Sequence, residues 1–321
     1  MAPKQIILTL LIMLCPIGMA AQNTITRNKP KPAVTKPKPA AKPKPKAKAK
    51  PAPRRNSTHH SGNTSRTNST SNINSTSSIN STSSTSSTDS LSVELKKLIN
   101  NMVYVSGGTF TMGGTSEQGS DAYDNEKPTH NVTLSSYYIC KYEVTQALWR
   151  VVMGSAPSYF KGDNLPVEQV SWNDCQTFIN RLNKYTGRKF RLPTEAEWEF
   201  AARGGNYSRH YKYSGSNNID DVAWYGDNSG NHSHPVGAKQ ANELDLYDMS
   251  GNVWEWCSDW DGSYSSNSQS NPTGPNSGSY RVKRGSSWSY SSRDCRSSSR
   301  GSGTPSYRSG ELGLRLVLSH L

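Results

Sequence analysis

The first 90 residues almost lack acidic side chains. They contain fourteen Lys or Arg residues and one acid, Asp89, so the net charge of +13 comes from this part of the chain. Residues 91–321 contain 23 basic and 23 acidic residues. A domain with balanced charge lacks the basic surface that binds nucleic acids. We therefore predict no nucleic-acid partner for the folded part.

Cysteine is also scarce. The chain has five Cys residues, and no two of them form a Cys-x-x-Cys pair, which excludes a finger-type zinc site. The seven His residues show no metal-ligand spacing, and no nucleophile-elbow motif supports a catalytic Ser. Cys140, Cys175, Cys257 and Cys295 follow the N-terminal apolar run, and four cysteines in an exported chain permit disulfides with three possible pairings.

Long apolar runs are absent beyond the N-terminus. Lys4 precedes an apolar run over residues 6–19, which ends at Ala20 and Ala21. This run is short for a membrane span, and a basic start, an apolar core and small residues at the exit are typical of a secretory signal peptide. We predict a signal peptide over residues 1–21 and export of the protein. The bulky Leu14 before Cys15 argues against a lipid-anchored cysteine.

Two tracts of low complexity follow. Residues 22–55 are rich in Lys and Pro, which favours an extended spacer; the alternative function is contact with an anionic cell surface. Residues 56–90 are rich in Ser, Thr and Asn, with Asn-Ser-Thr repeated at 56, 68, 74 and 80. Such a segment buries too little apolar surface to fold, so we predict a disordered stalk before a single domain over residues 91–321.

Alternating β-formers over residues 103–112 predict a hairpin turning at Gly107-Gly108, and residues 130–140 predict a further strand. Residues 91–102 are expected to form a short amphipathic lead-in helix, and residues 145–153 another helix.

Two further helices have start signals. Ser171 precedes a segment with apolar residues on one helical face, and Thr194 and Glu197 form a capping-box pattern. The second of these helices is expected to end at Gly204-Gly205. Gly, Ser, Asn and Tyr dominate from there on, which predicts long loops pinned by ions, disulfides or specific contacts.

Trp, Gly and carboxylate residues recur at fixed offsets in several short phrases. These phrases are Val105-Ser-Gly-Gly-Thr-Phe-Thr-Met-Gly113, Tyr142-Glu-Val-Thr-Gln146, Pro166-Val-Glu-Gln-Val-Ser-Trp-Asn173, Leu192-Pro-Thr-Glu-Ala-Glu-Trp-Glu199, Gly251-Asn-Val-Trp-Glu-Trp256, Arg284-Gly-Ser-Ser-Trp288 and Leu312-Gly-Leu-Arg315. In this order they resemble the sulfatase-modifying-factor family, whose founding activity is the formylglycine-generating enzyme. The resemblance implies an α+β fold with sparse regular structure, related to C-type lectin domains.

The resemblance also implies a copper site. The family's enzyme oxidises a sulfatase cysteine to formylglycine with copper and oxygen, and two cysteines five residues apart hold Cu(I), a soft ion that prefers thiolates. If Cys295 aligns with the second of these, Tyr290 stands at the first. If the alignment is anchored instead on Thr304-Pro305, Cys295 matches neither position, so the pair is incomplete in both cases. One thiolate holds copper weakly, and we do not expect a functional copper site.

Three further positions match residues that line the family's pocket: Ser287, Trp254 and Arg300. With Cys295 they are the candidate catalytic residues if the protein is an oxidase. In the alternative interpretation, Trp254 fills the core and Arg300 pairs with a carboxylate.

A calcium site is better preserved. By resemblance, its ligands are the side chains of Asp248 and Glu255 and the carbonyl groups of Gly251 and Val253. Calcium takes several oxygen ligands and accepts such a mixture on an irregular loop. The alternative is a loop in which the two carboxylates accept hydrogen bonds from backbone N–H groups.

The C-terminal run over residues 286–311 is rich in Ser, Tyr, Arg and Gly, and no Asn follows Asn276. Such a composition is typical of binding surfaces, and it resembles the variable tails of lectin-fold proteins that retroelements diversify at Asn codons. The alternative is a Ser-rich surface loop.

Two functions follow from these observations. The first is a non-catalytic, calcium-stabilised binding or surface-assembly module, which binds a protein, peptide or glycan at the 286–311 surface. The second is a formylglycine-generating oxidase. The incomplete cysteine pair favours the module.

Overall fold

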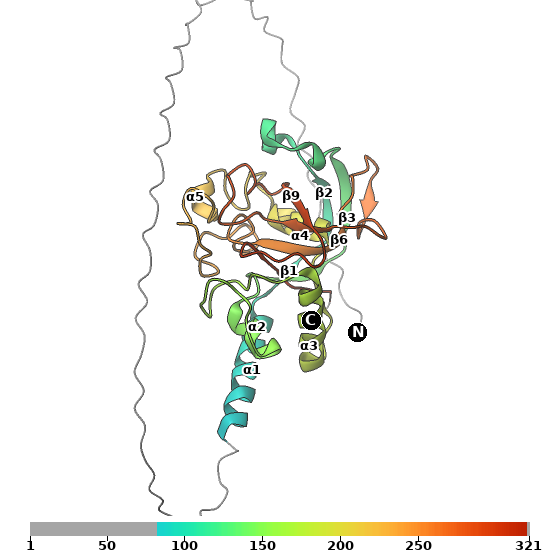
Figure 1. Ribbon diagram of the computed structural model, residues 1–321. Helices are drawn as coiled ribbons and strands as arrows, with labels where there is room; N and C mark the ends of the chain where they lie inside the picture. Colours follow the sequence, from blue (N-terminus) through green and yellow to red (C-terminus); the bar gives the residue numbers. More distant parts are fainter. Residues whose placement is uncertain (1–81, 320–321) are drawn as a thin grey trace, which may run out of the picture. The chain divides into compact units, whose positions relative to one another are not determined.

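The computed structural model describes residues 82–319 (Figure 1). The predicted signal peptide, the basic linker and residues 56–81 of the predicted stalk lie outside this range. Helix α1 spans Thr82–Asn100 and so begins nine residues before the lead-in helix that the sequence predicts. Leu98 is buried, and Leu91, Leu95 and Ile99 pack against the same core cluster. Within residues 82–319, no helix is long and apolar enough to cross a membrane.

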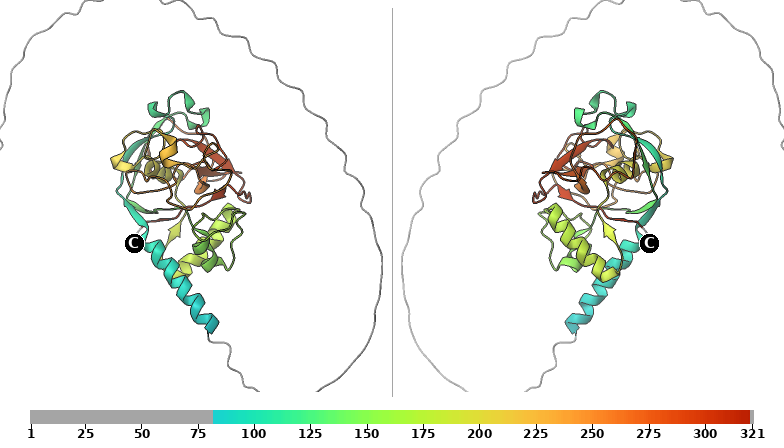
Figure 2. Two further views of the ribbon diagram at one scale, coloured as in Figure 1. Left: turned by 90° about the vertical axis from the view of Figure 1, so that its left-hand side faces the viewer. Right: turned by 90° about the vertical axis from the view of Figure 1, so that its right-hand side faces the viewer.

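Three helices begin within one residue of the starts that the sequence predicts. Helix α2 (Gln146–Met153) is capped by the side chain of Thr145. Helix α3 (Trp172–Thr186) starts with a capping box formed by Ser171 and Asp174, and α4 (Glu195–Ala202) starts with one formed by Thr194 and Glu197. Gly204 follows α4 with a φ of 88°, in the left-handed region that favours glycine. Figures 1 and 2 show α1, α2 and α3 together at one end of the domain.

The first sheet contains strands from the N-terminal and the C-terminal parts of the domain's sequence. Its strand order is β1-β4-β11-β5, with β1 at Met102–Val105, β4 at Tyr137–Cys140, β11 at Val317–Leu318 and β5 at Phe190–Arg191. All its pairs are antiparallel. A second sheet has the order β2-β3-β7, with β2 at Gly108–Met112, β3 at His130–Leu134 and β7 at Gln269–Ser270.

The hairpin predicted around Gly107-Gly108 is wrong. Strand β1 pairs with β4, and β2 pairs with β3, so the chain passes from one sheet to another between them. A Cβ at Gly107 would lie 2.5 Å from the carbonyl oxygen of Leu134. The glycine therefore permits a close approach of two backbones rather than a tight turn.

A third sheet carries most of the candidate site. Its order is β10-β6-β8-β9, with β6 at Trp254–Trp260, β8 at Arg281–Arg284, β9 at Arg300–Gly303 and β10 at Leu312–Gly313. The remaining elements are short: the 3-10 helices η1 (Ser116–Asp121), η2 (Asp124–Glu126) and η3 (Gly205–Tyr207), and the single turn α5 (Ile219–Val222). Between α5 and β6 the chain makes no helix or strand beyond one isolated bridge, which confirms the prediction of sparse regular structure.

Buried ion pairs connect these loops to the sheets. All four cysteines in the described range are free and buried, so disulfides do not pin the loops. Six Arg–Glu contacts with little or no solvent exposure are present instead in the described part of the chain: Arg203–Glu199, Arg284–Glu195, Arg284–Glu199, Arg296–Glu126, Arg300–Glu195 and Arg315–Glu255. A buried charge is costly unless it is paired and hydrogen-bonded. These pairs therefore specify where each loop must lie.

Candidate functional site

The sheet β10-β6-β8-β9 separates the predicted pocket residues onto two faces. Glu255 is opposite Arg284, and Arg284 is opposite Arg300, so these three side chains share the face that packs on α4. Trp254 precedes Glu255 and points to the other face, where a Cβ at Gly301 would lie 3.2 Å from the Trp254 ring. Trp254 and Arg300 therefore lie on opposite faces of this sheet.

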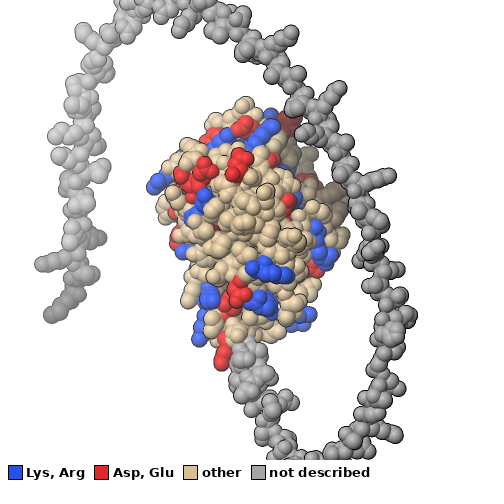
Figure 3. All heavy atoms as spheres, turned by 60° about the vertical axis from the view of Figure 1, so that its left-hand side comes forward, with Lys and Arg blue, Asp and Glu red and all other residues tan. Residues whose placement is uncertain are grey.

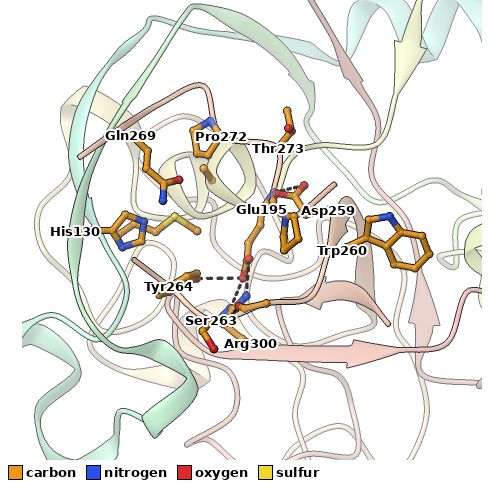
Figure 4. Close-up of a pocket in the computed structure, with 15 residues that line it drawn as sticks. His130, Glu195, Asp259, Trp260, Ser263, Tyr264, Gln269, Pro272, Thr273 and Arg300 are labelled. Carbon is orange, nitrogen blue, oxygen red and sulfur yellow. Dashed lines mark hydrogen bonds and ion pairs between the residues drawn. The ribbon is translucent and has the colours of Figure 1, made fainter. Parts of the chain in front are cut away.

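Arg300 is held by a carboxylate, as the alternative interpretation predicted. Its Nε and Nη2 donate to the two oxygens of Glu195 at 2.6 and 2.8 Å. The guanidinium carbon lies 4.1 Å from the centre of the Tyr264 ring, and the hydroxyl of Tyr264 donates to Glu195 (Figure 4). Burial would raise the pKa of Glu195, but Arg300 and Arg284 lower it below its usual range.

Trp254 lies in an aromatic cluster on the opposite face. Its ring meets that of Tyr290 edge-on at 5.5 Å, and it belongs to the main apolar core. The Nζ of Lys283 lies 4.6 Å from the centre of the Trp254 ring. It lies 6.0 Å from the centre of the Tyr290 ring and 5.9 Å from that of Tyr307. Tyr290, which replaces a copper cysteine in the resemblance, therefore packs as a core-facing ring.

Lys283 is a residue that the sequence analysis missed. It is 9% exposed, and among residues 82–319 its ammonium group contacts aromatic rings but forms no hydrogen bond or ion pair. Burial lowers the pKa of Lys283, and the nearby Glu311 carboxylate opposes this shift. In strand β8 Lys283 lies opposite Trp256, its cross-strand partner, and therefore shares the face of Trp254 and Trp256.

Ser287 is buried and lies close to this cluster. Its Oγ is 3.5 Å from the Oγ of Ser289, and Ser289 donates to Glu311 at 2.5 Å. The hydroxyl therefore joins a small polar group at the edge of the Trp254 face.

Cys295 is on neither face of the sheet. It packs in a small apolar cluster with Tyr213, Ile219 and Val222, and the other three cysteines belong to the two larger clusters. Burial raises the pKa of the Cys295 thiol to about 12. Because Cu(I) binds thiolates, a single buried thiol without a second cysteine does not fit this ion.

The predicted calcium ligands Asp248 and Glu255 are both buried. The Oδ2 of Asp248 accepts the Gly237 N–H at 2.7 Å, whereas Oδ1 is buried without a hydrogen-bond partner in the described part of the chain. Glu255 accepts from Arg315 at 2.7 Å and from the Trp198 indole at 2.7 Å. The loop between them bends through left-handed residues, including Asn252 and Gly251, where a Cβ at Gly251 would lie 2.2 Å from the Trp224 carbonyl oxygen.

A third carboxylate, Glu143, lies near this loop and was missed by the sequence analysis. It accepts the Val253 N–H at 3.1 Å and the Asn252 amide at 2.7 Å. Burial, Asp248 and Glu255 raise the pKa of Glu143. Arg315 supplies one positive charge, so the buried carboxylates outnumber it.

This excess of oxygen ligands and the unpaired oxygen of Asp248 suit a hard cation. Over residues 82–319, no three His, Cys, Asp or Glu side chains converge on one metal position. A calcium ion here would therefore need the carbonyl groups of Gly251 and Val253 as well as the carboxylates.

The segment 286–311 is divided by burial. Residues 295–300 and the pair Ser286-Ser287 are buried, while most of 288–294 and 301–311 reaches the surface. Arg296 is fully buried and donates to both oxygens of Glu126. Only the two exposed parts are available to a ligand. On the face drawn in Figure 3, basic and acidic side chains are interspersed without a large area of one sign.

Comparisons with known proteins agree with this architecture. Residues 88–320 match the family model for the sulfatase-modifying factor enzyme 1-like domain. The chain is 37% identical to the Chaperone protein LppX of Paenibacillus barcinonensis, over 59% of this chain and 79% of that protein. It is 37% identical to the formylglycine-generating enzyme of Streptomyces coelicolor, over 54% of this chain and 58% of the enzyme, so it matches little more than half of that enzyme's length.

Two solved structures share the fold. The Treponema denticola variable protein 1 aligns with a TM-score of 0.63 and 33% identity, over 68% of this chain and 95% of that one. PvdO from Pseudomonas aeruginosa aligns with a TM-score of 0.60 and 28% identity, over 68% and 94%. The mixed α/β fold with sparse regular structure is confirmed, and the chain belongs to the sulfatase-modifying factor enzyme 1-like family.

Proposed function

We propose that this protein is an exported, non-catalytic binding module, in which calcium stabilises the Asp248–Glu255 loop and the exposed parts of 286–311 bind a ligand. Export through residues 1–21 and contact of the basic linker 22–55 with an anionic cell surface are parts of this proposal. Family membership alone does not choose between a module and an enzyme, since relatives include a chaperone protein, a variable protein and formylglycine-generating enzymes.

One observation carries the proposal. The exposed parts of 286–311 contribute Tyr290 and Tyr307 to a group of aromatic rings, together with Trp254, around the ammonium group of Lys283. Tyr307 is 46% exposed and stands beside Lys283, which has hydrogen-bond donors to spare. Tyr and Arg are enriched at binding surfaces because they offer large contact area at a low entropic cost.

The aromatic surface continues onto a neighbouring loop. Trp288 packs edge-on against Phe160 at 5.6 Å, and Phe160 packs against Tyr159 at 5.0 Å. Tyr159 is 72% exposed. Beside it lies a hollow of about 710 Å³, which is also lined by Arg308. A ligand therefore has both an exposed aromatic rim and a concave place to enter.

The alternative function is the oxidase. It requires two thiolates close together, whereas the resemblance supplies at most one, and the Cys295 thiol is buried in an apolar cluster that contains no second cysteine. A metal centre that lacks a thiolate ligand loses the coordination geometry on which its chemistry depends. The absence of a second cysteine beside the buried Cys295 thiol therefore supports the binding module over the oxidase.

The test uses the full mature chain on peptide and glycan arrays, with two Tyr→Ala variants. Tyr307→Ala removes an exposed ring from the proposed surface, and Tyr185→Ala removes one that is 53% exposed on α3. A central interface Tyr is worth about 2 kcal/mol or more, so we expect Tyr307→Ala to weaken binding by about 30-fold and Tyr185→Ala to have little effect. Equal binding by both variants would contradict the proposed surface.

The oxidase alternative has its own assay. The Cu(I)-loaded chain is incubated with a cysteine-containing sulfatase peptide, and oxygen consumption and peptide mass are followed. Module function predicts no turnover. Turnover that disappears in Cys295→Ser would overturn the proposal in favour of the oxidase.

A further inference from the structure

A pocket of about 300 Å³ lies away from the Trp254 face. Its walls come from the second sheet, the start of α4 and the loops after β6, and they include His130, Glu195, Asp259, Tyr264, Gln269 and Arg300 (Figure 4). Arg300 reaches it from the sheet face opposite to Trp254. The volume is at the lower end of the range for small-molecule sites, and the pocket is separate from the surface proposed above.

One carboxyl group of the pocket has no cationic partner among residues 82–319, whereas Glu195 lies near two: besides Arg300, the Nη1 of Arg284 is 3.6 Å from a Glu195 oxygen. Arg300 is bound to both oxygens of Glu195, which leaves the Asp259 carboxyl group. Asp259 is 3% exposed, and its Oδ2 accepts the Glu195 N–H at 3.0 Å and the Ser258 hydroxyl at 2.9 Å. Asp259 forms no ion pair with any residue in 82–319.

The nearest additional cation is already engaged. Arg281 donates to the carbonyl oxygen of Ser258 and stacks between two indoles, with its guanidinium carbon 3.5 Å from the Trp260 ring centre and 4.0 Å from that of Trp172. It contributes to the field at Asp259 without pairing with it. Burial and the neighbouring Glu195 raise the pKa of Asp259 to about 7, as expected for a carboxyl group that lacks a cationic partner.

The remaining walls favour an organic cation over a metal ion or an anion. Tyr264 and His130 meet edge-on at 4.9 Å, and aromatic rings attract ammonium and guanidinium groups. Calcium or magnesium would need several converging oxygen ligands, but Asp259 is the one carboxyl group of this pocket that lacks an ion pair with residues 82–319. An anion would face both Asp259 and Glu195.

We propose that this pocket binds a small molecule with one protonated amine or guanidinium group, whose N–H donors contact Asp259 and whose apolar stem lies along the ring wall. This site is independent of the proposed ligand surface, so either can fail alone. The neutral alcohol or carboxylate of the same size should bind poorly, because neither satisfies the negative charge of the wall.

The test is calorimetric titration of the full chain at pH 8 with n-butylammonium, n-butanol and butyrate. Asp259→Asn keeps an oxygen that accepts the Glu195 N–H and removes the charge. Asp245→Asn is the matched control, because Asp245 is an exposed partner of Lys141 on a different loop. We expect n-butylammonium to bind the wild type and Asp245→Asn similarly, and Asp259→Asn at least tenfold more weakly. Equal affinity for Asp259→Asn, or for n-butanol, would overturn the proposal.

Two further measurements do not depend on that variant. Amide resonances of Asp259 and Tyr264 in the wild type should shift on addition of n-butylammonium, and an unchanged spectrum there would also overturn the proposal. The affinity should fall as the pH drops through about 7, where Asp259 takes up a proton. Other titratable groups also face this region: Glu195, Arg300, His130, Tyr264 and Asp261. The pH dependence of binding to Asp259→Asn measures any contribution from these groups, and the difference from the wild type is the contribution of Asp259.

Discussion

Glu126→Gln should destabilise the domain strongly, because it leaves a buried guanidinium without its charge partner. Arg296 and Glu126 are both fully buried. Arg296 donates to the two carboxylate oxygens at 2.8 and 2.5 Å, and Ser298 donates to one of them at 2.5 Å. Removing one partner of such a pair costs about 3–5 kcal/mol.

For a domain of this size, 1 kcal/mol corresponds to a change in Tm of about 2–4 °C, so the expected loss is about 6–20 °C. Urea unfolding followed by tryptophan fluorescence measures the free energy of unfolding directly. The control is Asp163→Asn, which breaks the Arg150–Asp163 pair, whose side chains are 44% and 70% exposed. Exposed pairs contribute about 0–1 kcal/mol.

The pH dependence gives a second check. Burial would raise the pKa of Glu126, but Arg296 and Ser298 outweigh it and hold the pKa below the usual 4.5. A lowered folded pKa means that this stabilisation is present above about pH 4.5 and is lost as the pH falls through the folded value. Glu126→Gln should remove that part of the acid sensitivity. A loss below about 1 kcal/mol, similar to Asp163→Asn, would refute the view that this pair anchors the segment 295–300.

Three other predictions concern the sites. Asp248→Ala should lower the Tm more in calcium than in chelator, because the lost hydrogen bond from the Gly237 N–H is common to both conditions; equal losses in both would remove the calcium proposal. Stability should fall as the pH rises from about 4 to about 7, because the folded pKa of Asp259 is raised from 3.8 to about 7; Asp259→Asn should abolish this slope and stabilise the protein above pH 7 by up to about 4 kcal/mol in urea unfolding. Cys295→Ser should leave array binding unchanged, since the thiol is buried away from the proposed surface; a loss of binding without a loss of folding would contradict that placement.

Much of the fold could be predicted from local patterns. The starts of α2, α3 and α4 were predicted correctly, because each start depends on a contact between a side chain and a backbone group three residues away. The family was evident from ordered phrases of Trp, Gly and carboxylates. The hairpin at Gly107-Gly108 failed because glycine signals both turns and close backbone approaches, and the difference depends on Leu134, which is distant in sequence.

The site residues depended still more on distant partners. The resemblance named Trp254 and Arg300 as candidate pocket residues, and the register of β6, β8 and β9 shows that their side chains lie on opposite faces of the sheet. Lys283 and Glu143 carried no local signal of their unusual surroundings.

By itself, the sequence determined the family, the helix starts and the sparse regular structure. These depend on which residues are present and on contacts within a few positions. Tertiary structure alone decided which carboxylate pairs with which arginine, which part of 286–311 is exposed and that Asp259 has no cationic partner. Burial and electrostatic pairing are set by side chains that meet across long sequence separations, such as Glu126 and Arg296, and no local pattern specifies them.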